Sequence, residues 1–134
     1  MTNRELAESY ALLNTTGHTG NMFIDGQTIY SYGYHFPIAT RLACGWYLIN
    51  SERYSNTTAR HISHVRMALI GSNIIESPMF GSPAKLAIDF DYLHSKYEEA
   101  MSKKARARSE GMKNVWNNTA REYARMIKLA NSYQ

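Results

Sequence analysis

The hydrophobic period of the sequence changes partway along the chain, and this change restricts the fold more than any other feature. Between residues 21 and 50, short runs rich in β-branched and aromatic residues alternate with turn residues, a pattern typical of strands. Over residues 83–132, large apolar residues recur at every third or fourth position, the spacing of amphipathic helices. These two patterns predict an α+β fold, in which helices cover a small antiparallel sheet. Because the chain has 134 residues, we expect it to form a single domain.

The clearest local signal is the Asp25-Gly26 pair inside MFIDGQTIYSYGYHF. A type I′ turn needs positive φ at both central residues, so this pair between two β-prone runs predicts a hairpin. A second hairpin is expected over PIATRLACGWYLIN, with its turn near Cys44 and Gly45. Because Pro37 cannot donate to a β-ladder, the strand before it should end there or become an edge. We predict three or four antiparallel strands in this part of the chain.

Four helices are predicted from apolar spacing and capping residues. Ser82 and Pro83 form a favourable helix start, a hydroxyl cap followed by proline in the first turn. Gly111 is less favourable than alanine by about 1 kcal/mol inside a helix, which favours a helical hairpin; the alternative is one bent helix of about 50 residues. The string NTTGHTGN is expected to be a loop, and IIESPMF a short strand or an extended connector. The predicted helices span residues 3–13, 57–70, 83–103 and 111–132.

Aromatic side chains occupy every second position of one stretch, with a histidine among them. These residues are Tyr30, Tyr32, Tyr34, His35 and Phe36. On one strand the four aromatic residues would share a face, because successive side chains point to opposite sides. We expect this row to pack in the core beneath a helix, since aromatic residues dominate core burial. The alternative is an exposed platform on which the bases of a nucleic acid stack.

Basic residues are concentrated near the end of the sequence. Residues 101–134 hold eight Lys or Arg and two acids, a net charge of +6, whereas residues 1–100 carry −2. This asymmetry suits binding to nucleic acid or to an acidic protein surface, and it is equally typical of a solvated helix face. The densest group, here called the basic segment, consists of Lys103, Lys104, Arg106, Arg108 and Lys113.

A second polar group surrounds the start of the predicted 57–70 helix. A helix N-terminus with nearby hydroxyls and arginines is able to bind an anion or a phosphate. Capping alone explains the Ser and Thr residues equally well. Together with the aromatic stretch, the candidate binding residues are Tyr32, Tyr34, His35, Arg53, Arg60, His61 and His64.

Two histidine-containing pairs raise the question of a metal site. His61 and His64 lie three residues apart on one predicted helix, as Asp91 and His94 do on another. If the two pairs faced each other, they could hold a transition metal and support a metal-dependent nuclease or hydrolase. The zincin, zinc-finger, phosphate-loop, dinucleotide-binding and serine-hydrolase motifs are all missing from the sequence. We therefore assign no catalytic residue, no metal and no cofactor, and expect a binding protein rather than an enzyme.

The strings YSYGYHFPIA and NSERYSNTTARHISHVRMAL resemble segments of small uncharacterised proteins from tailed phages. The resemblance covers roughly residues 28–70 and implies a phage accessory product. Such small proteins resemble host-takeover or counter-defence factors. The resemblance therefore implies a protein that binds and inhibits a host protein or a ribonucleoprotein.

The lengths of the apolar runs and the single cysteine bear on where the protein is located. No apolar run approaches the roughly 20 residues of a membrane span, and a lone cysteine suits a reducing compartment. We therefore predict a cytoplasmic protein, in the host cell if phage-encoded, with no membrane partner.

The 111–132 helix has more large apolar side chains than docking usually requires, which predicts a homodimer through residues 111–130. The alternative is that this face covers the sheet of its own chain.

Overall fold

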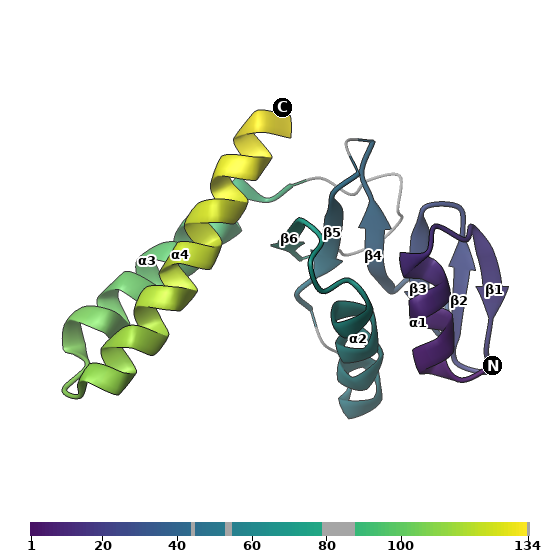
Figure 1. Ribbon diagram of the computed structural model, residues 1–134, viewed down its shortest axis with the longest axis horizontal. Helices are drawn as coiled ribbons and strands as arrows, with labels where there is room; N and C mark the ends of the chain where they lie inside the picture. Colours follow the sequence, from purple (N-terminus) through teal and green to yellow (C-terminus); the bar gives the residue numbers. More distant parts are fainter. Residues whose placement is uncertain (44, 53–54, 79–87, 134) are drawn as a thin grey trace. The chain divides into compact units, whose positions relative to one another are not determined.

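The computed structural model divides into two compact units, Met1–Ala87 and Ile88–Gln134, and each is described by itself (Figure 1). The described residues are 1–43, 45–52, 55–78 and 88–133. Strands and helices are both present, so the predicted α+β class is confirmed. The expectation that the two units form a single domain stays a prediction.

The first unit is built on a six-stranded sheet whose strands lie side by side in sequence order. The first five strands form antiparallel pairs, and the last one pairs parallel to the fifth. A parallel pair needs a crossover connection, which α2 supplies between β5 and β6. The strands are β1 (Thr16–His18), β2 (Met22–Asp25), β3 (Thr28–Ser31), β4 (Pro37–Arg41), β5 (Tyr47–Asn50) and β6 (Ile74–Ser77), and the helices are α1 (Asn3–Ala11) and α2 (Asn56–Ala68).

One part of the strand prediction was wrong, because the string NTTGHTGN contains strand β1 where a loop was expected. The antiparallel strands predicted within residues 21–50 are confirmed, and IIESPMF contains the short strand β6, one of its two expected alternatives, which adds a parallel pair to the sheet. The close approach of α1 explains the glycine within β1. A Cβ atom added at Gly17 would lie only 2.9 Å from Cδ1 of Leu6. Pairing of β1 with β2 uses backbone N–H and C=O groups, so a strand of polar residues with glycine at its centre can still pair.

The first predicted hairpin is confirmed, but its turn lies one residue further along the chain. Asp25 pairs with Thr28, so the two central residues are Gly26 and Gln27. Gly26 has φ of +66°, whereas Gln27 has no positive φ. Positive φ at the first position alone is the pattern of a type II′ turn, for which glycine is preferred. The second hairpin joins β4 to β5 as expected.

The aromatic row does not lie on one strand. Strand β3 ends at Ser31, and Tyr32 adopts φ of +65°, which turns the chain before Pro37 begins β4. Tyr30 and Phe36 are consequently buried, whereas Tyr32 and Tyr34 are 58% and 57% exposed. The core interpretation therefore holds for two of the four residues, and the other two lie on the surface.

The main hydrophobic core forms where α1 and α2 pack against one face of the sheet. The hydroxyl of Tyr10 donates to the carbonyl of Gln27 at 2.8 Å, and its ring meets Tyr47 edge to face. Burial raises the pKa of the Tyr10 hydroxyl. The helix and sheet residues at this centre include Leu6, Ile24, Ile29, Ile49, Ile62 and Val65.

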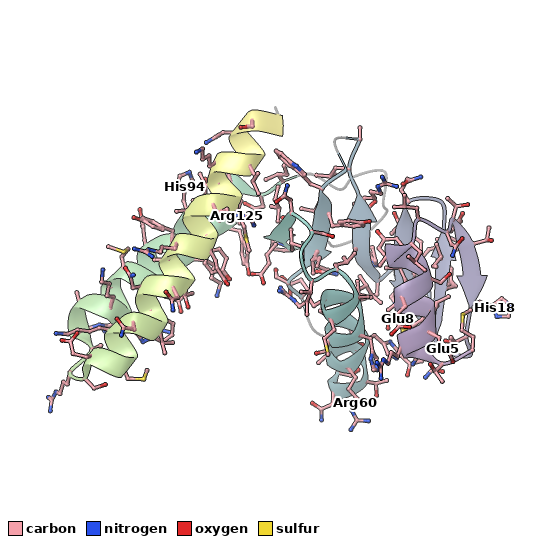
Figure 2. The ribbon with its side chains drawn as sticks, in the orientation of Figure 1. Glu5, Glu8, His18, Arg60, His94 and Arg125 are labelled. Atoms are coloured by element: carbon pink, nitrogen blue, oxygen red, sulfur yellow. The ribbon has the colours of Figure 1, made fainter. Side chains whose placement is uncertain are left out.

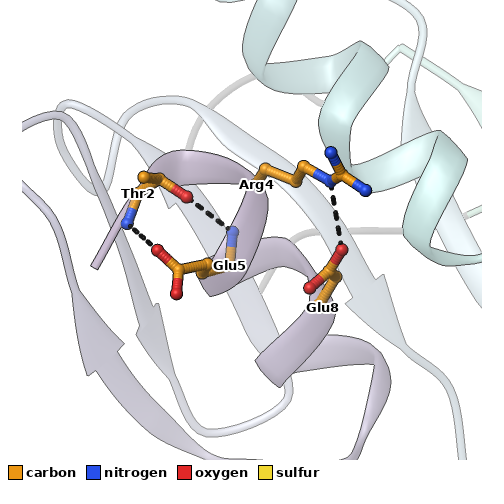
Figure 3. Close-up of polar contacts among 4 residues, drawn as sticks. All are labelled: Thr2, Arg4, Glu5 and Glu8. Carbon is orange, nitrogen blue, oxygen red and sulfur yellow. Dashed lines mark hydrogen bonds and ion pairs between the residues drawn. The ribbon is translucent and has the colours of Figure 1, made fainter.

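Both helices of the first unit begin at side-chain caps. In α1, Thr2 and Glu5 form a reciprocal capping box, and Arg4 pairs with Glu8 one turn later (Figure 3). The backbone N–H of Thr2 hydrogen-bonds the Glu5 carboxylate, which lowers its pKa. Ser55 caps α2 by accepting from the N–H of Thr58.

The second unit is a hairpin of two helices, α3 (Phe90–Arg106) and α4 (Glu110–Tyr133), joined by a short connection. This confirms two helices rather than one bent helix. The predicted start at Ser82 and Pro83 lies outside the described residues, and α3 begins after the cap Asp89. Small residues are prominent among those buried in the hairpin, which allows the helices to pack closely. The buried residues are Leu93, Ala100, Ala120, Met126 and Ala130.

Among the described helices, none combines the length and the apolar character that a membrane crossing needs.

The core assignment predicts very different effects for two isoleucines. Ile29→Ala removes a fully buried side chain and should lower the free energy of unfolding by about 2–5 kcal/mol, through lost burial and a residual cavity. Ile70→Ala is the matched control, because Ile70 is 79% exposed and its truncation should change stability little. Urea unfolding measures both variants. Equal losses would contradict the assignment of the core.

Candidate functional site

The basic segment gathers at the turn of the α3–α4 hairpin, which we call the tip. Lys103, Lys104 and Arg106 lie in the last turn of α3. Arg108 lies in the connection, and Lys113 lies near the start of α4. Cations near the C-terminus of a helix interact favourably with its dipole, so their position in α3 is also consistent with helix stability. All five predicted residues therefore lie at or near this turn of the hairpin.

A pocket of about 470 Å³ lies at the tip, and we call it the tip pocket. Its floor combines aromatic and apolar surface with cations. Trp116 is half-buried, and the Lys103 ammonium lies 4.6 Å from the centre of its ring. The lining residues are Lys103, Arg106, Ala107, Arg108, Ser109, Met112 and Trp116.

The basic residues of the tip differ in their partners. Lys103 pairs with Glu99 at 2.9 Å, and this hydrogen bond, with the charge of nearby Lys96, lowers the pKa of the Glu99 carboxyl. Lys104 donates to Asn117 at 2.9 Å, and Lys113 lies 3.5 Å from Glu110. These contacts are partly or fully exposed to solvent, where an ion pair contributes little to stability.

Arg106 and Arg108 are both exposed. In the part of the chain that the structure describes, neither guanidinium forms an ion pair with a carboxylate. Their charge is therefore available to an anionic partner. A planar guanidinium is well suited to bidentate contacts with phosphate.

His61 has a structural role in the first unit. Its side chain is buried, and its Nδ1 lies 2.7 Å from the hydroxyl oxygen of Ser31. The ring of Tyr32 lies against it, with the ring centres 5.5 Å apart. Burial lowers the pKa of His61, and the charge of His64 lowers it further. These contacts favour a core histidine over a metal ligand.

His64 occupies a different environment from His61. It is half-buried and lines a pocket of about 340 Å³ at the surface between α1 and α2. The other residues that line this pocket are Arg4, Glu8, Met67 and Ala68. Arg4 already pairs with Glu8, so the charge of the pocket is largely balanced.

The remaining predicted residues do not gather into one site. Arg60 is exposed and extends from α2 in Figure 2, and Arg53 lies outside the described residues. His35 is exposed, and Tyr34 donates from its hydroxyl to the Asp25 carboxylate at 2.7 Å. That hydrogen bond raises the pKa of Tyr34. At the start of α2 the Ser55 hydroxyl is the cap and the Thr58 hydroxyl lies 3.1 Å from it, which favours the capping alternative left open by the sequence.

The four proposed metal ligands are divided between the units. His61 and His64 lie on α2, whereas Asp91 and His94 lie on α3, where both are exposed. Figure 2 labels His94 on its helix. Within the described ranges, no three His, Cys, Asp or Glu side chains are placed together to hold a metal ion. The tip pocket thus remains the strongest candidate site.

The fold and the tip define a small α+β protein with a basic helical hairpin. A family model matches residues 7–73, half of the chain, and the chain belongs to that family, described as Family of unknown function (DUF8033). No curated protein and no solved structure matches the chain. The matched segment runs from within α1 to the residue before β6, so it does not include the α3–α4 hairpin.

The burial of His61 predicts a specific pH dependence of stability. Because its pKa is lowered in the folded state, the unfolded chain binds the proton more readily below its usual pKa of 6.5. The free energy of unfolding should therefore fall as the pH is lowered from about 7 towards 5. His61→Gln should remove this contribution, and His18→Gln, at an exposed position, should retain it. Urea unfolding at several pH values tests this, and parallel curves for the wild type and His61→Gln would contradict it.

Proposed function

We propose that this protein is a non-enzymatic binding protein whose tip binds nucleic acid. The observation that carries the proposal is that Lys103, Arg106 and Arg108 line one pocket with the half-buried Trp116 at the turn of the hairpin. Arg106 and Arg108 offer exposed guanidinium groups for direct contact with phosphate. Lys103 and Lys113 take part in weak surface pairs, so each can exchange a carboxylate for a phosphate at little cost.

The second candidate is the accessory role that the resemblance to phage proteins implies. In this proposal the protein acts in the host cytoplasm by binding and inhibiting a host protein or a ribonucleoprotein. One observation favours a protein partner on the first unit. Met67 and Ile70 near the C-terminal end of α2 are 69% and 79% exposed, and large apolar side chains of this kind suit a protein interface.

Capture of partners from host lysate, with and without nuclease treatment, separates the two candidates. Partners that bind through the tip should be lost when their nucleic acid is digested, whereas a partner on the first unit should remain. Met67→Glu with Ile70→Glu should release only the nuclease-resistant partner. If charge reversal at the tip does not reduce capture of the nuclease-sensitive partners, the nucleic-acid candidate is wrong. If Met67→Glu with Ile70→Glu does not reduce capture of the nuclease-resistant partner, the accessory role through a protein partner is wrong.

Charge reversal at the tip should weaken binding to nucleic acid. The variant Arg106→Glu/Arg108→Glu should lose roughly tenfold or more in affinity per lost contact, because charge-assisted hydrogen bonds to phosphate are strong. Its slope of log affinity against log salt should also fall, by about 0.7–0.9 for each phosphate contact removed. Fluorescence anisotropy with a labelled oligonucleotide, titrated at several salt concentrations, measures both quantities.

The matched control for charge reversal lies elsewhere on the same hairpin. Arg121→Glu/Lys128→Glu changes the net charge by the same amount at two exposed positions of α4 away from the tip. If this control weakened binding as much as the tip variant, the effect would come from net charge and the proposed site would be wrong. Lack of binding by the wild type to both DNA and RNA at about 50 mM salt, which favours phosphate contacts, would end the proposal.

We also propose that the protein forms a homodimer through α4. Met126 is buried within the hairpin, so part of the expected interface serves the fold of the second unit. Val115 remains 51% exposed on α4 and does not line the tip pocket. A second copy would cover this apolar side chain and leave the tip pocket open.

The dimer proposal predicts that Val115→Lys produces a monomer. A charge placed inside an apolar interface loses solvation without a partner, so the dimer should dissociate while the hairpin stays folded. Asn118→Lys adds the same charge at another exposed position of α4 and should leave the dimer intact. Light scattering at micromolar concentration gives the mass, and circular dichroism gives the helix content. A wild-type mass equal to that of one chain would refute the dimer.

A further inference from the structure

We propose that the tip pocket holds one unpaired nucleotide, so that the hairpin selects single-stranded nucleic acid over a duplex. This inference rests on the proposed function and assigns a role to the ring of Trp116. The base would stack on the indole ring, and the phosphates on either side would meet Arg106 and Arg108. The cations of the tip alone would not distinguish a single strand from a duplex.

The pocket has the size and the chemistry for such a ligand. It is a shallow, open depression of about 470 Å³, where a base can lie against the ring of Trp116 with its phosphates at the surface. Met112 and Trp116 give it apolar and aromatic surface, and the guanidinium-bearing residues Arg106 and Arg108 line the same pocket. A nucleotide presents the same combination, a flat aromatic base joined to a charged phosphate. The paired bases of a duplex are already stacked on one another, so only an unpaired base can offer its face to the indole.

Lys103 occupies the position over Trp116 that the base would take. Its ammonium lies 4.6 Å from the ring centre and also pairs with Glu99. A lysine stem is flexible, so the ammonium can move from the ring to a phosphate when the base arrives. At an exposed site, the attraction between a cation and an aromatic ring is weaker than base stacking on that ring. Replacing the Lys103 ammonium by a base over the ring of Trp116 is therefore favourable.

The start of α4 adds to the attraction for phosphate. Ser109 and Met112 both line the pocket, and the backbone N–H of Met112 donates to the Ser109 hydroxyl at 3.1 Å. The positive end of the helix dipole thus lies at the pocket wall. An acidic peptide would also meet these charges, but a carboxylate side chain has no aromatic face for Trp116. The ring is the feature that favours a nucleotide.

The test compares one single strand with its duplex. A fluorescein-labelled thymidine oligonucleotide of about 12 nucleotides, within the usual site sizes of single-strand binders, is titrated alone and paired with its complement. The wild type should bind the single strand more tightly. Trp116→Leu should weaken single-strand binding by about 5- to 150-fold and leave duplex binding nearly unchanged. Trp116→Phe retains an aromatic ring and should keep most of the single-strand affinity.

Each outcome separates the inference from the proposed function. If neither probe binds, both are wrong. If the single strand and the duplex bind equally and Trp116→Leu changes neither, the basic tip still binds nucleic acid but the nucleotide pocket is refuted. A glutamate peptide of equal charge that competes as well as the single strand would also refute the pocket, in favour of general anion binding. If circular dichroism shows that Trp116→Leu unfolds the hairpin, the comparison rests on Trp116→Phe and on the wild-type preference, and a wild type that prefers the duplex refutes the inference.

Discussion

The packing of α1 and α2 against one face of the sheet is the interaction on which the first unit depends. Leu6 from α1 and Val65 from α2 are both fully buried, and both belong to the core that contains Ile29 of β3. This shared core holds two segments that lie about 50 residues apart in the chain. It also fixes the Ser31–His61 hydrogen bond, because strand and helix can meet there only when the core is formed. The candidate site, in contrast, belongs to the second unit and depends on the pairing of α3 with α4.

Local patterns predicted the elements better than they predicted the contacts. Gly26 was sufficient to place a hairpin, but the turn began at this residue rather than at Asp25, since pairing with β3 set the register. Strand β1 was missed because its polar residues carry no alternating signal, and Gly17 is explained by the close approach of Leu6 and by its φ of +147°. The spacing of His61 placed it on a helix face, but its partner is 30 residues away in sequence. Local spacing cannot reveal such a partner.

The basic segment shows what a sequence can reveal of a site and what it cannot. A run of Lys and Arg is visible in composition, and its position near a helix break placed it at a turn. Trp116 lay in the segment predicted either to form a dimer interface or to cover the sheet of its own chain. Its place beside Lys103 was not predicted, because the two lie 13 residues apart and the register of the hairpin was unknown. The signal that could have found it is the predicted hairpin itself. Folding the two helices back at their connection, residues 107–109, brings the tryptophan opposite the end of α3.

The position of β6 has a consequence for the family segment. The family match ends at residue 73, one residue before the strand that pairs parallel to β5. A fragment limited to the matched residues would leave the backbone N–H and C=O groups of β5 without their partners along one side. Leu48 and Ile49 make this edge apolar, and an open apolar edge pairs readily with a strand of another chain. In this protein β6 pairs with that edge and becomes the last strand of the described sheet. The Arg66–Glu76 ion pair ties β6 to α2, and a charged residue on an edge strand disfavours pairing with another chain.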